Sequence, residues 1–407
     1  NTFRRLFAEG TFNAAFIPSY TSEKLKNNKS GKIFADDVLS LLVFILLLIV
    51  TLAEIFTPLL VYLIAPGFLV DNVKFNLAVE FTRITFPFLL FVSLSSFFSG
   101  ILNSNNKFAA ASAAPIILNI VLILSIMISY NYNFNIAKQL SYGVTIAGII
   151  QLIFLIYISW EFYKPSLVFK FKLTKKIKFF FKKLLPSVLS SGVTQINILI
   201  GTIIASFQSG AVSYLYYADR VYQINLAIAG IAVGTVSLPV LSKVLKTKNL
   251  SKISYIQNKS LELSLLFSIP ASLGLIIASE EIINGLFGYG SFSLDDVEMT
   301  SNALMIFGYG VIAFALIKIL GNFFFARDNT KTPFYISTLI VFINILISII
   351  FFKDIGFIII PIATSISSWF NSILLFLFLK YRQLFYFNQI FFIKFIKIIF
   401  ASILMGI

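Results

Sequence analysis

Apolar runs of about 18 residues or more recur along the whole sequence, and they constrain its fold more than any other feature. Each run is long enough to cross a hydrocarbon core of about 30 Å as a helix. Hydrophobic residues make up 58% of the 407 residues, and the mean hydropathy of +0.92 is far outside the range of soluble domains. The runs lack the ten-residue alternation of a membrane barrel. The sequence therefore predicts an all-α, polytopic membrane protein.

Twelve apolar segments can be delimited, and the first, which holds Arg4, Arg5 and Glu9, is expected to end near Tyr20. The others are expected at about 37–65, 76–102, 108–130, 137–160, 184–207, 211–240, 256–283, 299–326, 332–352, 356–380 and from 390 onward. Loops of different charge connect these segments, so the loops predict the orientation of the chain.

Lysine and arginine are concentrated in alternate loops, where 22 of the 32 basic residues lie on one side of the predicted membrane. The loop 164–183 alone carries eight lysines, whereas the opposite loops carry Lys74, Lys138, Lys353 and an acidic stretch at 295–298. The basic side is predicted to be cytoplasmic. Much of the net charge of +15 is therefore a topology signal and a contact with anionic lipid, not a nucleic-acid site.

An internal repeat divides the chain. AAFIPSYTSEKLK aligns with GTVSLPVLSKVLK, pairing Pro18 with Pro239, and a second alignment pairs Asn119 with Asn344. The separation along the chain is nearly the same in both pairs and their order is the same, which predicts two pseudo-symmetric six-helix bundles in the same orientation. The predicted parts are an N-terminal lobe (1–163) lacking its first helix, a basic cytoplasmic linker (164–183), a C-terminal lobe (184–382) and the truncated start of extra C-terminal helices (383–407). We expect roughly one further helix before Asn1.

Several ionisable residues lie within the predicted spans, where an isolated charge at the centre costs at least about 2.5–3.5 kcal/mol. Arg5 and Glu9 are four residues apart and share one helical face, whereas Arg4 points about 100° away. The helix that the repeat makes equivalent carries Asp219 and Arg220, with Tyr216 four residues before the arginine and Gln223 three after it. The hypothesis is a central cationic site formed by Arg4, Arg5, Glu9, Asp219, Arg220 and Lys318.

Two structural roles of these charges stay open as alternatives. Intramembrane arginine–acid pairs can hold helices together, and residues near the end of a span can reach the interface. For Lys318, and for Arg83 with its neighbour Glu80, a structural role weighs as much as a functional one. Glu54 is a further candidate within a span.

Arginine suits a phosphate-bearing anion, because its planar fork binds phosphate through two hydrogen bonds. The sequence contains no His, no Cys and no phosphate-binding Gly-rich loop, and the Asp pairs at 36 and 295 are expected in loops without a third acid at metal-ligand spacing. We therefore expect neither an enzyme nor a bound cofactor or metal. Transport would draw on an ion gradient, the membrane potential or a substrate gradient, and the coupling ion stays open.

The stretches NTFRRLFAEGTFNAAFIP, ITFPFLLFVSLSSFFSGILN, SYLYYADRVYQ, GTVSLPVLSK and ARDNTKTP closely resemble the MurJ (MviN) family of bacterial lipid II flippases. That family belongs to the superfamily of multidrug, oligosaccharidyl-lipid and polysaccharide exporters. The resemblance extends in order from Asn1 to about Lys331 and is looser beyond. It implies two six-helix lobes plus two C-terminal helices, in a multi-pass protein of the bacterial inner membrane that serves cell wall synthesis.

By resemblance, Arg4, Arg5, Glu9, Asp219 and Arg220 line a central cavity that holds the pyrophosphate and headgroup of lipid II, the undecaprenyl-diphosphate-linked disaccharide pentapeptide. Lys318 matches a basic position of the family's tenth helix. The arginine motif of the family's first helix is absent from this chain, and Gln223 stands where the family often has an acid.

The resemblance and the charges together predict a lipid II flippase that works by alternating access of two lobes. A flippase for another polyprenyl-diphosphate-linked oligosaccharide is the alternative. A multidrug exporter is a weaker one, since cationic drugs favour an acidic cavity. A membrane scaffold that transports nothing would keep its function after loss of the cavity charges.

Overall fold

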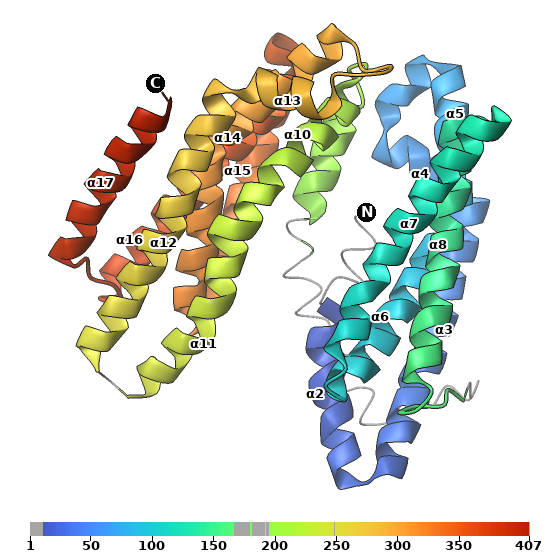
Figure 1. The fold of residues 1–407 in the computed structure, drawn as a ribbon, viewed down its shortest axis with the longest axis horizontal. Helices are drawn as coiled ribbons and strands as arrows, with labels where there is room; N and C mark the ends of the chain where they lie inside the picture. Colours follow the sequence, from blue (N-terminus) through green and yellow to red (C-terminus); the bar gives the residue numbers. More distant parts are fainter. Residues whose placement is uncertain (1–10, 167–179, 181–191, 193–194, 248, 407) are drawn as a thin grey trace. The chain divides into compact units, whose positions relative to one another are not determined.

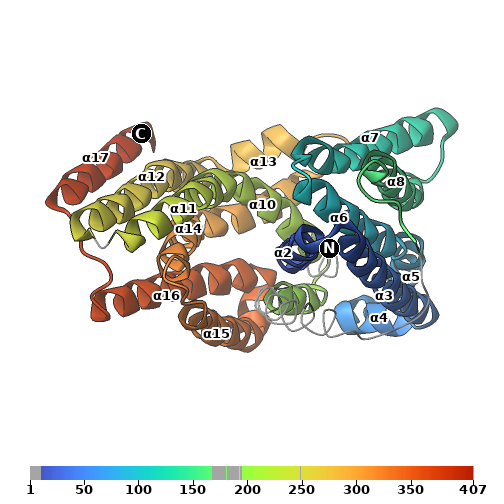
Figure 2. The ribbon, with the colours of Figure 1, turned by 90° about the horizontal axis from the view of Figure 1, so that it is seen from below.

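The computed structural model describes residues 11–166, 180, 192, 195–247 and 249–406 (Figures 1 and 2). Within these ranges the chain is helical and contains no strand, so the predicted all-α class is confirmed. Nine described helices are long and apolar enough to cross a membrane. The chain divides into two compact units, Asn1–Leu199 and Ile200–Ile407, which we call the N-terminal and C-terminal units. Most of the predicted linker 164–183 lies outside the described residues, so the lobe boundaries stay a prediction.

The N-terminal unit is built around one helix, α6, which contacts four others in the described part of the unit: α2, α3, α7 and α8. Prolines divide two pairs of helices in this unit, α3 from α4 and α5 from α6. The helices and their bounds are α2 Thr11–Lys26, α3 Asn28–Ile55, α4 Thr57–Ile64, the 3-10 helix η1 Pro66–Val70, α5 Asn72–Thr85, α6 Phe88–Ser104, α7 Phe108–Tyr132 and α8 Ile136–Ser159.

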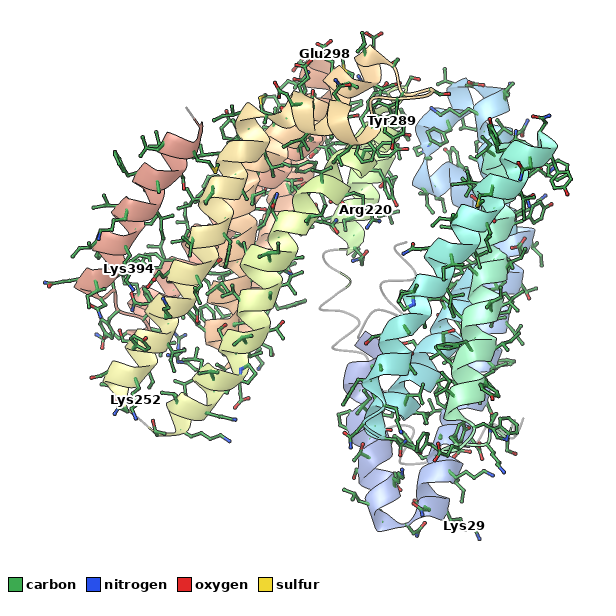
Figure 3. The ribbon with its side chains drawn as sticks, viewed as in Figure 1. Lys29, Arg220, Lys252, Tyr289, Glu298 and Lys394 are labelled. Atoms are coloured by element: carbon green, nitrogen blue, oxygen red, sulfur yellow. The ribbon has the colours of Figure 1, made fainter. Side chains whose placement is uncertain are left out.

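The first described helix continues further than the sequence indicated. α2 extends through Pro18 to Lys26, so its expected end near Tyr20 is wrong. A proline removes one backbone donor, but helix continues where the turns on both sides can still pack. The stop comes instead from Asn27, whose side chain accepts a hydrogen bond from the backbone N–H of Ser30 (2.5 Å) and starts α3. Figure 3 shows Lys29 at this turn.

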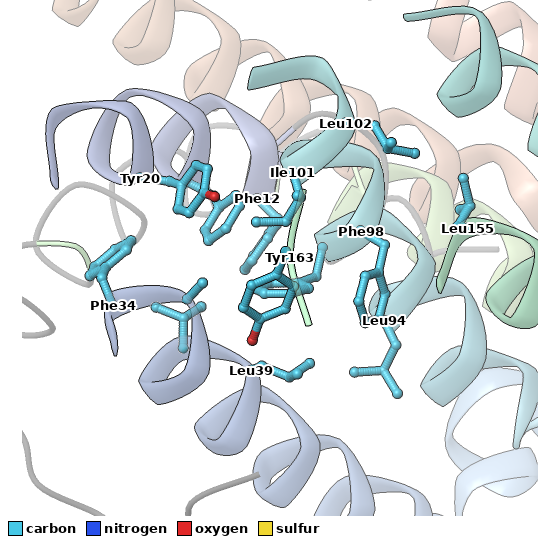
Figure 4. Packing of buried hydrophobic residues seen from close by; sticks show 14 of the residues in the cluster. Phe12, Tyr20, Phe34, Leu39, Leu94, Phe98, Ile101, Leu102, Leu155 and Tyr163 are labelled. Carbon is cyan, nitrogen blue, oxygen red and sulfur yellow. The ribbon is translucent and has the colours of Figure 1, made fainter. Parts of the chain in front are cut away.

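Aromatic side chains fill the core where α2, α3 and α6 meet (Figure 4). The rings of Phe16 and Phe97, both fully buried, have centroids 4.9 Å apart, and Tyr20 stacks on Phe16 at 5.6 Å. Burial of each ring removes a large apolar area from exposure, and the contacts between the rings stabilise the packing further. The core therefore fixes the position of α2 within its unit.

Prolines break two spans that the sequence presented as single helices. α3 ends at Ile55 and α4 begins at Thr57, because the nitrogen of Pro58 has no hydrogen to donate to the carbonyl of Glu54. The hydroxyl of Thr57 donates to that carbonyl instead (2.9 Å). α5 ends in the same way before Pro87. Each of these spans can therefore bend at a defined point.

The side chain of Asp36 is buried inside a helix, so the expectation that the Asp36 pair lies in a loop is wrong. Its carboxylate accepts hydrogen bonds from the hydroxyl of Tyr163 (2.6 Å) and from the backbone N–H of Ser166 (3.0 Å). Burial, and then the hydrogen bond to Asp36, raise the pKa of Tyr163. The stability that this proton contributes is present below the ordinary tyrosine value of about 10 and is lost only as the pH rises toward the raised value. Asp36 thereby ties the residues after α8 to α3.

Replacing Tyr163 with phenylalanine is expected to destabilise the protein by about 1.5–3 kcal/mol, because a buried carboxylate loses a hydrogen bond from a hydroxyl. Thermal unfolding of the purified protein in detergent measures the loss. The matched control is Tyr157→Phe, since the Tyr157 side chain is 80% exposed. Equal stability of the two variants would show that the hydrogen bond between Tyr163 and Asp36 contributes nothing to stability.

The C-terminal unit is built around α14, which lies between α12 and α16 (Figure 2). Two serines bond to its backbone from opposite sides: Ser272 donates to the carbonyl of Gly308 (2.8 Å) and Ser365 to that of Ile306 (2.9 Å). The described helices are α10 Ala211–Leu226, the π-helix η2 Ala227–Ala232, α11 Val233–Lys246, α12 Leu250–Ile277, α13 Ser279–Phe287, α14 Leu294–Phe325, α15 Lys331–Ile355, η3 Gly356–Ile358, α16 Ile359–Tyr381 and α17 Gln389–Gly406.

Helix starts recur between the two units at a nearly constant spacing. α3 begins at Asn28 and α12 at Leu250, and the same separation recurs from the start of α5, at Asn72, to the start of α14, at Leu294. The starts of α7 and α15 are one residue further apart than those of α3 and α12, and so are the starts of α8 and α16. This order agrees with the internal repeat predicted from the sequence.

The Asp pair at 295 lies in the first turn of α14, so the expectation that this pair lies in a loop is wrong. Ser293 and Asp296 form a capping box, in which each side chain accepts a hydrogen bond from the other's backbone N–H. These bonds satisfy backbone donors that the first turn of a helix leaves free, so the helix starts before the apolar run does.

The last helix, α17, packs on α12. The carboxylate of Glu262 on α12 lies 2.8 Å from the ammonium of Lys259 and 3.0 Å from that of Lys394 on α17. Two polar residues of α12, Gln257 and Asn258, also donate to carbonyls of the turn before α17. An ion pair within a membrane protein holds its helices together, so α17 is fixed to the C-terminal unit at its first turns.

Candidate substrate-binding site

The helix that carries Asp219 and Arg220 is one segment of a longer rod. α10 follows Gly210, whose φ of +75° is a left-handed conformation that glycine adopts at no steric cost. A Cβ at this position would lie 2.5 Å from the ring of Tyr214. From Ala211 the backbone continues through η2 into α11 and ends at Lys246, a span of 36 residues. The π-helical turn in the middle is a geometry frequently found at functional sites.

Neighbouring turns of α10 hold the two charged side chains apart. The guanidinium of Arg220 stacks over the ring of Tyr216, with the carbon Cζ 4.7 Å from the ring centroid. The amide of Gln223 donates to the carboxylate of Asp219. Within the described residues no carboxylate pairs with Arg220, so the N–H groups at the edge of the guanidinium are not occupied by an acid. Stacking leaves this edge accessible to an anion. Figure 3 marks Arg220 on α10.

Aromatic packing also holds α10 against α13, the turn after it and α14. The ring of Tyr217 lies 4.9 Å from that of Phe287 at the end of α13 and 5.5 Å from that of Phe292 in the following turn. Tyr222 packs in the same manner on Phe307 of α14 (4.8 Å). These contacts hold the backbone that presents Arg220 in one position within its unit.

Close helix packing positions Lys318. α14 approaches the rod at Gly230 and Gly234, which are four residues apart and leave room for another backbone. A Cβ on Gly230 would lie 3.3 Å from the Cα of Ala315 and 3.4 Å from the Cγ of Lys318. Asn322 of α14 donates to the carbonyl of Gly234 (2.8 Å). The stem of Lys318 therefore lies against the π-helical turn.

The structure brings together only some of the predicted site residues. Asp219 and Arg220 are neighbours on α10, and Lys318 lies beside Gly230 of the same rod. Gly230 is ten residues after Arg220, a rise of about 15 Å along the helix at 1.5 Å per residue. In the described ranges no hydrogen bond or ion pair joins Lys318 to Asp219 or Arg220. Arg4, Arg5 and Glu9 lie outside the described residues, so their place in a common site stays a prediction.

Sequence reasoning named the residues around Arg220 but not their pairing. Tyr216 and Gln223 are four and three residues from Arg220, and in the structure the tyrosine packs on the arginine whereas the amide donates to Asp219. The spacing alone allowed either choice. Among the described residues, no group of three or more acids is placed to hold a metal ion.

Comparison with known proteins assigns the family. A family model described as lipid II flippase MurJ matches residues 1–407. The chain belongs to the MurJ lipid II flippase family. A probable lipid II flippase MurJ of Rhizobium tropici is 39% identical over 389 residues, covering 94% of this chain and 73% of that protein. One of Rickettsia prowazekii is 38% identical over 386 residues, covering 91% and 73%. The family resemblance drawn from the motifs is thus confirmed.

Solved structures of a MurJ protein and of a MATE transporter share the fold. Lipid II flippase MurJ in an inward closed conformation matches with a TM-score of 0.84 at 29% identity, covering 99% of this chain and 82% of that one. An inward-facing multidrug resistance MATE family transporter of the MOP superfamily matches with a TM-score of 0.79 at 14% identity, covering 94% and 87%. At that identity the second match is a likeness of fold alone.

Proposed function

We propose that this chain is a flippase that moves lipid II from the inner to the outer leaflet of the bacterial inner membrane. Its membership of the MurJ family carries the proposal, because relatives at 38–39% identity over most of its length are named probable lipid II flippases. The described helices suit a multi-pass membrane protein. By this function the chain serves peptidoglycan synthesis, since lipid II is the lipid-linked precursor of the cell wall.

Arg220 is the described residue best placed to bind the diphosphate of the substrate. Its guanidinium is stacked on Tyr216 and has no acid partner among the described residues. Phosphate is an anion that arginine binds through two parallel hydrogen bonds. Arg4, Arg5 and Lys318 would add positive charge along the path of the headgroup. Glu9 and Asp219 would balance that charge and help release the substrate.

Transport by alternating access requires that the substrate binds the inward and outward states with different affinity. A diphosphate bound by Arg220 would favour the state in which this guanidinium contacts it. Release would follow in the state in which water reaches the guanidinium. In this scheme the chain is a transporter and not an enzyme, since no bond of the substrate is broken.

A flippase for another polyprenyl-diphosphate-linked oligosaccharide would use the same arginines, because the diphosphate is common to both substrates. The two substrates differ in the sugar and peptide, which the charged residues do not distinguish. A multidrug exporter is disfavoured by the arginine on α10, which repels cations. The MATE likeness does not favour it, because that match is one of fold alone.

The test is complementation in bacteria whose own lipid II flippase can be depleted. The full-length protein is expected to restore growth and the labelling of lipid II in the outer leaflet. Membrane abundance is checked by immunoblot. If growth and lipid II export fail at normal abundance while another polyprenyl-linked oligosaccharide reaches the outer leaflet, the substrate assignment is wrong.

A further inference from the structure

An acid and an arginine lie within the N-terminal unit, apart from the residues assigned to the substrate. Glu54 on α3 is near the middle of the apolar run 38–65, within about 5 Å of its midpoint by helical rise. One of its carboxylate oxygens, Oε1, is buried and has no hydrogen-bond partner among the described residues. Charged groups at this depth are costly and mark functional sites in membrane proteins.

Arg83 is the charged neighbour of Glu54. It lies on α5, and its positive charge acts on the Glu54 carboxylate, although the two do not form an ion pair. Of the described helices packed on α3, α4 and α6 carry no charged residue. α2 carries only Glu23, Lys24 and Lys26, at its cytoplasmic end. Within the described part of the unit, Arg83 therefore dominates the field at Glu54.

Further charges extend from this pair toward the outer side. Glu80 is one helical turn from Arg83, and its carboxylate lies 2.7 Å from the ammonium of Lys138 on α8. The side chains of Glu80 and Lys138 are 43% and 48% exposed. In the predicted orientation these residues are nearest the outer surface and Glu54 is deepest. Polar side chains therefore extend from the outer interface to the depth of Glu54.

Both members of the pair occupy bending points. Glu54 lies four residues before Pro58 and Arg83 four residues before Pro87, the prolines at which α3 and α5 end. A proline leaves the carbonyl four residues earlier without its helical hydrogen bond. Broken helices of this kind surround the ion and substrate sites of many transporters. An interaction between the two side chains would bear directly on how far the two spans bend.

The C-terminal unit has no such pair at the matching positions. At the spacing that relates the starts of α3 and α12, Glu54 corresponds to Ile276 and Arg83 to Met305. α14 also continues without a break through the position that corresponds to Pro87. Because the repeated fold forms without these charges, the fold alone does not account for Glu54 and Arg83.

We propose that Glu54 is a protonation site within the membrane, which takes up a proton from the water on the outer side. The carboxylate and a hydronium ion become a carboxylic acid and a water molecule, and Arg83 keeps its charge. Ionised Glu54 attracts Arg83 and restrains the two proline bends, and neutral Glu54 releases them. The proton thereby changes the conformational preference of the N-terminal unit. Its effect on export rests on the proposed flippase function, whereas the protonation itself does not.

Infrared difference spectroscopy of the full-length protein in nanodiscs, between acidic and alkaline buffer, tests the site directly. A carbonyl stretching band of a protonated carboxyl is expected in the wild type, absent in Glu54→Gln and kept in the control Glu80→Gln. In Arg83→Gln the band should persist to higher pH, since the positive neighbour is gone. If Glu54→Gln is folded by circular dichroism and no band depends on Glu54, this side chain does not change its protonation between the two buffers and the proposal is wrong.

Lipid II export at different external pH then tests the coupling. Wild-type export is expected to change with external pH, whereas Glu54→Gln export should not, because its amide cannot titrate. If the band is present and both proteins respond equally to pH, the site does not couple to transport and that part of the proposal is overturned. If the wild type exports no lipid II while the band persists, the flippase assignment fails and the protonation site stands.

Discussion

Replacing Arg220 with alanine is expected to abolish lipid II export at normal membrane abundance. The guanidinium is the described group with free donors and a fixed position, and each charge-assisted hydrogen bond to phosphate contributes about 1.5–3 kcal/mol. Losing one such bond weakens binding by about 10- to 150-fold, and losing both bonds of a bidentate contact weakens it much further. Outer-leaflet lipid II in flippase-depleted cells is the measurement.

Substitutions at Arg220 and its neighbour separate charge from geometry. Arg220→Lys keeps the charge but loses the planar fork, so its export should fall between wild type and alanine. Tyr216→Phe keeps the ring under the guanidinium and should export normally, whereas Tyr216→Leu removes that support and should export less. Arg382→Ala is the matched control, because Arg382 is an exposed arginine at the end of α16.

The opposite result would be informative. If Arg220→Ala exports as well as Arg382→Ala, the arginine on α10 holds helices together and does not bind the diphosphate. A loss in Arg220→Ala accompanied by low abundance would instead identify it as a folding residue. In both cases the cationic site would have to be sought among other residues.

Membrane helices were predictable because hydropathy over about 20 residues directly reflects the cost of placing backbone and side chains in lipid. The points at which these helices break were harder to predict. The spans 37–65 and 76–102 contain Pro58 and Pro87 and are divided there, whereas α2 continues through Pro18. The proline itself is identical in all three. What differs is the packing of the turns on each side, which the local sequence does not contain.

Asp36 illustrates the same limit for charged residues. An acid pair next to a basic loop predicts side chains in water. The structure instead buries Asp36 against Tyr163 and Ser166, which follow it by 127 and 130 residues. Partners that distant cannot be paired from one sequence. Asp219 and Arg220, in contrast, were found because their partners lie within one helical turn.

The position of Lys318 depends on a glycine, and this gives a second prediction with a large effect. The Lys318 stem packs on the π-helical turn because Gly230 has no side chain there. Gly230→Leu is expected to separate α14 from the rod and to lower stability by about 1–3 kcal/mol, as other overpacked sites do. Export should fall as well, because Lys318 and the helix that carries Arg220 would both move. Thermal unfolding and lipid II export in cells measure the two effects.

Gly274→Leu on α12 is the matched control, because a Cβ at Gly274 meets no atom within 4 Å. The two variants add the same side chain to a helix of the same unit, so a difference between them reports the close approach of α14 at Gly230 and not the loss of a glycine. If Gly230→Leu has the same unfolding temperature and the same lipid II export as Gly274→Leu, the contact between α14 and the π-helical turn tolerates the added side chain. Lys318 would then be held by its own helix alone, and its distance from Arg220 would be free to change during transport.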